Sequence, residues 1–143
     1  MKKDDIIGGA FLLAAILGLG AFFLFANNAP QLTYGPVEIA GSTITATASG
    51  DGEVEVTATL IEPGFVTIHR SIGGAPGPII GSSGYIEVGT DVAMTLMLSE
   101  LMETGTTYIA LLHVDDGDER FVVSEDMPVT SDGVSVRADF IGP

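Results

Sequence analysis

The pattern of hydrophobic and polar positions changes once along the chain. Ile6 to Ala26 is an uncharged run of about twenty residues, enough for a helix to cross a hydrocarbon core of ~30 Å. From Thr33 onward the apolar positions recur with a period of two, which is typical of strands. The pattern predicts an N-terminal transmembrane helix as an anchor over residues 1–29 and a β domain over residues 30–143.

The β domain is expected to contain seven to nine short strands and no long helix. The clearest strand is Glu53–Leu60, in which Val54, Val56 and Ala58 face one way and the polar residues the other. The other segments are Ser42–Ala48, Phe65–Arg70, Tyr85–Val88, Val92–Leu98, Thr107–Val114, Phe121–Val123 and Val134–Phe140. Turn-forming residues separate them, so the sequence predicts a mainly β fold, an antiparallel β-sandwich.

Two connections are expected to lack strand structure. Gly73–Gly84 holds five Gly and two Pro, so we expect a long crossing loop from which Ile79 and Ile80 return to the core. Ser99–Glu103 is compatible with one helical turn.

Charge is divided as unevenly as hydrophobicity. The chain has 5 Lys+Arg against 19 Asp+Glu and a net charge of −14, although its mean hydropathy is +0.46. In residues 1–29 the charges of Lys2 and Lys3 are balanced by two aspartates, so the β domain over residues 30–143 carries the whole −14. This charge excludes nucleic acid as a partner. The absence of Cys excludes disulfides, thiolate zinc sites and a cysteine nucleophile.

The basic residues orient the anchor. Lys2 and Lys3 precede the apolar run, and the next Lys or Arg is Arg70, so the positive-inside rule places the N-terminus in the cytoplasm and the β domain outside the cell. A cleaved signal peptide, with Leu24 and Ala26 before the cleavage site, is the competing interpretation. The apolar run is longer than the usual signal-peptide core, which favours a retained anchor. A pilin-type leader is a third possibility, but the usual Gly followed by Glu is missing.

Small residues form a stripe on the predicted helix. Ala10, Ala14 and Gly18 are spaced at i, i+4 and i+8, the small-xxx-small arrangement that lets helices approach closely in a membrane. The stripe predicts packing against a partner protein's helix or a second copy, although Ala and Gly are also simply common in membrane helices.

His69 and His113 are the two histidines of the chain, each near the end of an apolar strand. Phe65, Thr67 and His69 are expected to share one strand face, as are Ile109, Leu111 and His113. On neighbouring strands the two imidazoles could bind Cu or Zn, with Asp115 as a third ligand or an orienting group and with Met94, Met97 or Met102 as a soft ligand. We favour a structural role in which each ring bonds a backbone carbonyl, because metal sites normally show three or four ligands. No cofactor is therefore expected.

The acidic turn Asp115–Glu119 offers oxygen ligands for Ca²⁺, but its spacing is not that of an EF-hand, and a solvated hairpin turn explains it. Catalytic motifs are missing: the chain has no G-x-S-x-G, and Gly73–Gly77 lacks the Lys of a phosphate loop. We therefore do not expect an enzyme.

The order and spacing of several motifs resemble a known family. The series runs through Pro63–His69, Pro78–Ser83, Tyr85-Ile86, Gly89-Thr90 and Gly105-x-x-Tyr108-x-Ala110-x-Leu112-His113, and ends in the acidic turn. It is similar to an uncharacterised β-domain family of secreted and membrane-anchored archaeal proteins, many from salt-loving species. The resemblance covers about Leu32 to Phe140 and implies an immunoglobulin-like or cupredoxin-like sandwich outside the cell, with no known activity.

Together these features predict a membrane-anchored structural or interaction protein. It would be an accessory subunit of a membrane complex or a cell-envelope component. A metal-binding or electron-transfer module built on His69 and His113, and a pilin-like filament subunit, are the alternatives.

Overall fold

The computed structural model describes residues 35–143. The predicted anchor over residues 1–29 and its stripe of Ala10, Ala14 and Gly18 lie outside the described residues. Over residues 35–143, no helix is long and apolar enough to cross a membrane.

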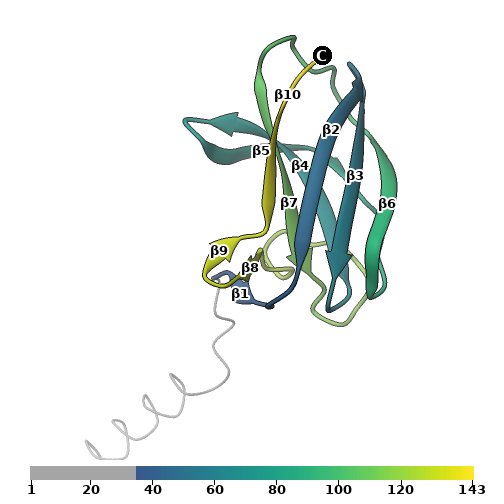
Figure 1. The fold of residues 1–143 in the computed structure, drawn as a ribbon, viewed down its shortest axis with the longest axis vertical. Helices are drawn as coiled ribbons and strands as arrows, with labels where there is room; N and C mark the ends of the chain where they lie inside the picture. The colour runs from purple at the N-terminus through teal and green to yellow at the C-terminus, as the bar shows by residue number, and fades with distance from the viewer. Residues whose placement is uncertain (1–34) are drawn as a thin grey trace, which may run out of the picture. The chain divides into compact units, whose positions relative to one another are not determined.

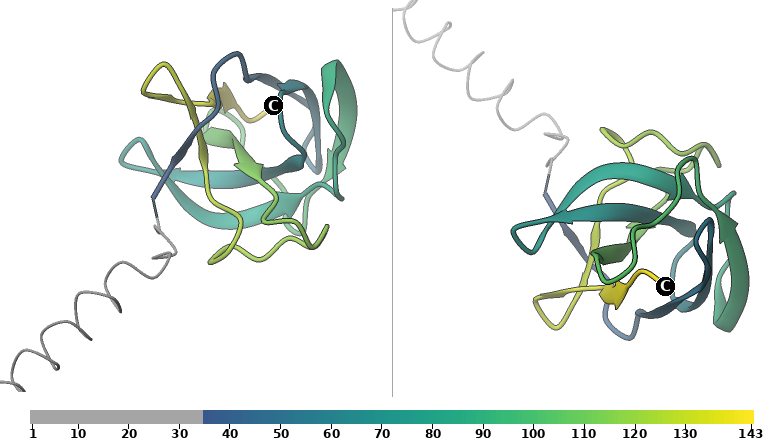
Figure 2. Two further views of the ribbon diagram at one scale, coloured as in Figure 1. Left: turned by 90° about the horizontal axis from the view of Figure 1, so that it is seen from below. Right: turned by 90° about the horizontal axis from the view of Figure 1, so that it is seen from above.

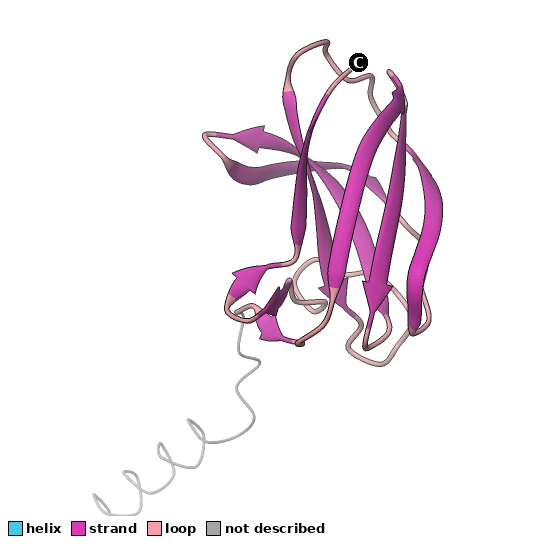
Figure 3. Cartoon of the chain, in the orientation of Figure 1, coloured by secondary structure: helices cyan, strands magenta, loops and turns pink. Residues whose placement is uncertain are grey.

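The described residues form a β-sandwich, which confirms the mainly β prediction (Figures 1 and 3). One layer has the strand order β10-β7-β4-β5, the other β2-β3-β6, and both are antiparallel; a small third sheet has the order β1-β8-β9. The bounds are β1 Val37–Glu38, β2 Thr43–Gly50, β3 Glu53–Leu60, β4 Gly64–Ile72, β5 Ala75–Ser82, β6 Gly89–Met97, β7 Thr107–Val114, β8 Val129–Ser131, β9 Val134–Ser135 and β10 Arg137–Ile141.

The main core lies between the two large sheets. Alternation along β3 sends Val54, Val56, Ala58 and Leu60 inward, all at most 1% exposed. From the opposite sheet, β4 and β7 contribute their own alternate residues, namely Val66, Ile68, Tyr108, Ala110 and Leu112. Burial of such apolar surface is the main driving force that holds the two layers together.

The strands β4 and β7 are buried on both faces. Phe65 and Thr67 alternate with the core residues of β4, yet they are 1% and 0% exposed. Ile109 and Leu111 do the same on β7 and are 0% and 5% exposed. Two-sided burial explains why these two strands are almost continuously apolar in sequence. The outer face of this sheet therefore holds a second buried layer, to which both histidines belong.

The predicted loop Gly73–Gly84 is wrong, because most of it is strand β5, paired with β4. Gly73 and Gly74, with φ of +60° and +84°, make the two-residue turn between Ile72 and Ala75. The two prolines are tolerated because β5 is an edge strand. The tip of this hairpin projects from the body of the domain (Figures 1 and 2). Ile80 is buried as expected, but Ile79 is 36% exposed.

Three shorter expectations also need correction. Tyr85–Val88 is not a strand but makes one bridge, between Ile86 and Gly64. Phe121–Val123 belongs to the long connection between β7 and β8, and Ser99–Glu103 forms a bend with no helical turn. The predicted strand Val134–Phe140 is divided at Val136, whose backbone bonds Val129 and Leu112 and so leads the chain from the small sheet to the large one.

Tyr108 fixes the connection that enters β7. Its ring is fully buried and packs near Phe140, with 5.9 Å between ring centroids. Its hydroxyl oxygen accepts a 2.8 Å hydrogen bond from the backbone N–H of Glu103, five residues upstream. A buried Tyr bonded back to the preceding connection is the tyrosine corner of Greek-key sandwiches.

The small sheet joins the start of the described chain to its last third. β1 pairs in parallel with β8, through Val37 N–H to Pro128 O and Ile39 N–H to Thr130 O at 2.8 and 2.7 Å. The Glu38 carboxylate accepts hydrogen bonds from Thr130 and from the backbone N–H groups of the turn at Asp132 and Gly133. These bonds lower the pKa of Glu38.

Candidate functional site

Both histidines lie in the outer buried layer of the four-stranded sheet. His69 is on β4 and His113 on β7, and they are 5% and 2% exposed. In the antiparallel register Thr67 is paired with Leu111, Phe65 with His113 and His69 with Ile109. The two histidines therefore lie diagonally on either side of Thr67, on the shared face that the alternation predicts.

Thr67 connects the two rings. Its Oγ1 lies 2.7 Å from Nε2 of His69 and 3.0 Å from Nε2 of His113. The hydroxyl is also 3.5 Å from the carbonyl oxygen of Leu111, a marginal distance for a hydrogen bond. The rings are nearly parallel, with centroids 6.4 Å apart. The result is a continuous polar chain, His69–Thr67–His113, inside an apolar layer.

The other nitrogen of each ring is bound to a backbone carbonyl, so the predicted bonds to carbonyl groups are present at both residues. His69 Nδ1 is 2.8 Å from the oxygen of Gly77 on β5, and His113 Nδ1 is 2.8 Å from the oxygen of Asp126. A carbonyl oxygen has no hydrogen, so each Nδ1 must carry one. His69 thereby holds the β4–β5 hairpin, and His113 holds the connection after β7.

Burial governs the acid–base behaviour of both rings. Desolvation lowers the pKa of His69, and the bond to Gly77 opposes this in part. Desolvation likewise lowers the pKa of His113, against the bond to Asp126 and the Asp126 charge, while the neighbouring His69 lowers it further. The neutral forms are favoured because an imidazolium in this layer loses its hydration.

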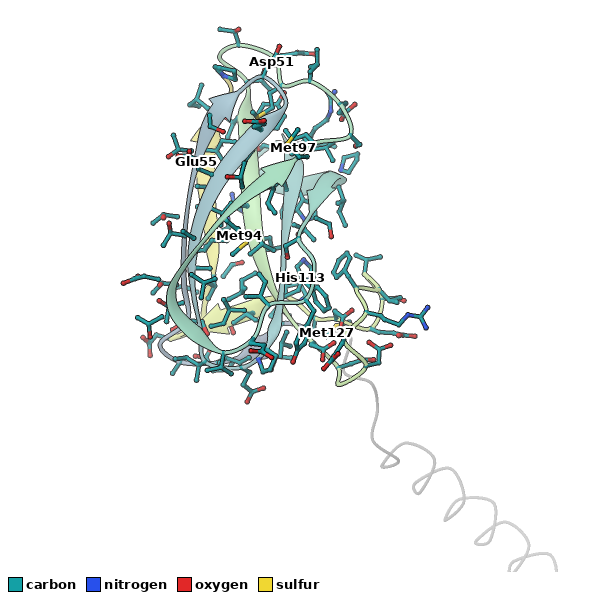
Figure 4. The ribbon with its side chains drawn as sticks, turned by 90° about the vertical axis from the view of Figure 1, so that its right-hand side faces the viewer. Asp51, Glu55, Met94, Met97, His113 and Met127 are labelled. Atoms are coloured by element: carbon teal, nitrogen blue, oxygen red, sulfur yellow. The ribbon has the colours of Figure 1, made fainter. Side chains whose placement is uncertain are left out.

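The connection between β7 and β8 covers the site. Phe121 places its ring 5.2 Å from that of His113 and 5.4 Å from that of Phe65. Asp126 is fully buried, and its carboxylate accepts bonds from the backbone N–H groups of Asp116 and Val122 at 3.0 and 2.6 Å. Figure 4 shows His113 close to this connection, near Met127. The buried carboxylate thus fixes the loop that keeps water from the histidines.

Asp115, the third residue of the predicted metal set, is part of the acidic turn. Its carboxylate oxygens accept hydrogen bonds from the backbone N–H groups of Gly117 and Glu119, both at 3.1 Å. Ligand atoms of Asp115, Asp116 and Asp118 lie within 4.8 Å of one another. Desolvation first, and then the neighbouring acidic groups, raise the pKa of Asp116. The acidic turn is not the predicted hairpin turn, because it lies in the long connection between β7 and β8, but hydrogen bonding within the turn accounts for this arrangement.

The methionines considered as soft ligands are not beside the histidines. Met102 is buried in the main core and Met94 packs against it, on the other side of the four-stranded sheet from His69 and His113. Met97 is 67% exposed on β6 (Figure 4). The groups that do contact the two rings are therefore Thr67, two carbonyls and aromatic carbon.

The sequence held a signal for only some of these partners. Thr67 is two residues before His69, so strand alternation correctly placed it on the histidine face, although not as the link between the two rings. Gly77 was assigned to a loop, and Asp126 was one acidic residue among many, with no periodicity to mark it as buried. Both depend on connections whose paths are set by tertiary contacts.

Comparison with known proteins identifies relatives at the cell surface. A family model described as a domain of unknown function, DUF7282, matches residues 40–140. Cell surface glycoprotein 2 of Haloarcula hispanica is 35% identical over 91 residues, and cell surface glycoprotein 1 of the same organism is 34% identical over 91 residues. Each alignment covers 62% of this chain but 10% of the glycoprotein. No solved structure matches the chain.

Proposed function

Because the chain belongs to the DUF7282 family, we propose that it is a non-catalytic surface domain of an archaeal cell envelope, held outside the membrane by its N-terminal helix. The observation that carries the proposal is the similarity of the β domain to a segment of two cell surface glycoproteins. Because that segment is about a tenth of each glycoprotein, the comparison supports a module of the cell surface.

The distribution of charge supports an extracellular position in salt-rich water. Of the acidic residues after Ala29, Asp126 alone belongs to the buried set of residues 35–143. The surface is therefore strongly anionic, which keeps a protein soluble and suppresses non-specific association. An immunoglobulin-like sandwich with a tyrosine corner at Tyr108 is a scaffold that many cell-surface domains use. The two asparagines of the chain, Asn27 and Asn28, are not in Asn-x-Ser/Thr, so the sequence has no motif for N-glycosylation.

Site-specific labelling tests the location and the orientation together. The chain has no Cys, so Thr90→Cys on the exposed start of β6 and Asp5→Cys before the apolar run each introduce a single thiol. We expect a membrane-impermeant maleimide to label Thr90→Cys on intact cells, and to label Asp5→Cys only after lysis. Asp5 is chosen because acidic residues contribute little to membrane orientation.

The possible outcomes separate the alternatives. Protection of Thr90→Cys on intact cells would contradict the surface location. Labelling of Asp5→Cys without lysis would reverse the orientation. Recovery of a mature chain that begins after Ala26, determined by mass spectrometry, would replace the retained anchor with a cleaved signal peptide while leaving the surface domain outside.

The anchor is proposed to bind a partner helix or a second copy through Ala10, Ala14 and Gly18. Gly18→Leu would separate the packed backbones by the width of a side chain and remove their dispersion contacts. We expect this variant to lose its partners on purification in mild detergent, whereas Leu12→Phe, away from the stripe, retains them. Equal retention by both variants would leave the helix as an anchor only.

A further inference from the structure

The buried polar chain His69–Thr67–His113 has more acceptors than hydrogens when both rings are neutral. Each Nδ1 donates to a carbonyl, so in a neutral ring each Nε2 has a lone pair and no hydrogen. Both Nε2 atoms face Thr67 Oγ1, at 2.7 and 3.0 Å. The hydroxyl has one hydrogen and can satisfy one of them. The other contact then brings two lone pairs together at hydrogen-bond distance in a layer that excludes water.

One added proton satisfies every contact. If Nε2 of His69 carries it, that N–H donates to Thr67 Oγ1, and the hydroxyl donates to Nε2 of His113. Moving both hydrogens one step, from Nε2 to Oγ1 and from Oγ1 to the second Nε2, transfers the positive charge to His113 and breaks no other bond. A second proton would place two unhydrated positive charges on stacked rings whose centroids are 6.4 Å apart.

We propose that the His69–Thr67–His113 cluster binds one proton per domain and shares it between the two Nε2 atoms through the Thr67 hydroxyl. Thr67 is then a positioning residue, because it holds both nitrogens at one oxygen and carries the hydrogen between them.

The surroundings are consistent with one charge. Besides Thr67, the hydrogen-bond partners of the two rings are the uncharged carbonyls of Gly77 and Asp126, and the ring of Phe121 lies beside His113. The charged group acting on His113, besides the other histidine, is Asp126, whose carboxylate is held by two backbone N–H groups. Desolvation lowers the pKa of both rings, so uptake is expected below the ordinary histidine value of about 6.5.

Histidine-selective ¹⁵N labelling tests the proposal, because the 143 residues contain only these two histidines. The full chain in detergent is titrated from neutral to acid pH, and the nitrogen chemical shifts report the fraction of each Nε2 that is protonated. While the domain stays folded, as judged by circular dichroism, we expect the two fractions to rise together and to sum to one. Both Nδ1 signals should stay protonated throughout.

Two variants distinguish sharing of the proton through the Thr67 hydroxyl from the effect of burial alone. Thr67→Val keeps the shape but removes the hydroxyl, so the proton affinity of the pair should fall by about tenfold or more, the loss expected for a hydrogen bond to a charged group. Thr67→Ser restores a hydroxyl at the same place and should keep the one-proton uptake. If Thr67→Val does not fold, the proton count in the native protein still decides the proposal.

Several results would overturn it. Uptake of two protons by the folded domain, uptake of none before it unfolds, or unchanged uptake in Thr67→Val would each show that no proton is shared. One Cu or Zn per chain by elemental analysis, lost in His69→Gln, would show that the Nε2 atoms bind a metal instead.

Discussion

The hydroxyl of Tyr108 offers a clean measure of how much the tyrosine corner stabilises the domain. Tyr108→Phe retains the buried ring and its packing near Phe140, and removes only the oxygen that accepts the 2.8 Å bond from Glu103 N–H. A net hydrogen bond contributes about 0.5–1.5 kcal/mol, and a buried donor left without an acceptor costs about 1–3 kcal/mol. Because Glu103 itself is exposed, water can reach part of the freed N–H. We therefore expect a loss of about 1–2 kcal/mol in the free energy of unfolding.

Urea unfolding of the detergent-solubilised chain, followed by circular dichroism, measures this loss without changing ionic strength. A destabilisation of this size corresponds to a fall in Tm of roughly 5–15 °C for a domain of about a hundred residues. Tyr85→Phe is the matched control, because the Tyr85 side chain is partly exposed and its substitution should change stability by less than about 0.5 kcal/mol. If Tyr108→Phe is as stable as Tyr85→Phe, the corner bond contributes nothing and the reasoning is wrong.

Three further predictions concern pH, close packing and salt. Because burial lowers the folded-state pKa of His69 and His113, their contribution to stability is complete above about pH 6.5 and is lost as pH falls toward the folded-state values. The free energy of unfolding then falls by up to about 1.4 kcal/mol per pH unit for each proton that only the unfolded state binds. The urea midpoint should therefore decrease between pH 7.5 and pH 5, and an unchanged midpoint would contradict this. Gly64→Ala should destabilise the domain by about 1–3 kcal/mol or prevent folding, because the new Cβ meets the carbonyl oxygen of His113, whereas Gly84→Ala, in open space, should be neutral in the same assay. Raising NaCl from 0.1 to 1 M shortens the screening length from about 10 to 3 Å, so repulsion within the −14 surface should weaken and Tm should rise; an unchanged Tm would show that this repulsion is unimportant.

Strand positions were predictable where burial is one-sided or where the apolar run is continuous. Glu53–Leu60 and Thr107–Val114 coincide with β3 and β7, because alternation in the first and uninterrupted apolar residues in the second leave little choice of bounds. The histidine face was predictable for the same reason, since a period of two fixes which residues share a side.

The remaining misses have two physical causes. Pro76 and Pro78 were part of the reason for predicting a loop, but proline is tolerated in an edge strand such as β5, which needs no backbone donor on its open side. The glycine pair before β5 forms a hairpin turn. Phe121 seemed to begin a strand because it is aromatic and followed by two valines. Its ring instead packs against His113 and against Phe65, which is far away in sequence. Local patterns carry no information about such coverage.

The parallel pairing of β1 with β8 has a mechanical consequence. Figure 1 shows β1 and the end of β10 at opposite ends of the long axis, so tension applied between the two ends of the domain would run roughly along the strands. Because β1 is the first strand of the domain, this tension first reaches the backbone bonds at Val37 and Ile39 and the Glu38 bonds to the turn after β8. These bonds join β1 to a segment in the last third of the chain, so they must break before the sandwich itself is pulled apart. The first two residues of β structure thus form the attachment point at which tension from the N-terminal side enters the sandwich.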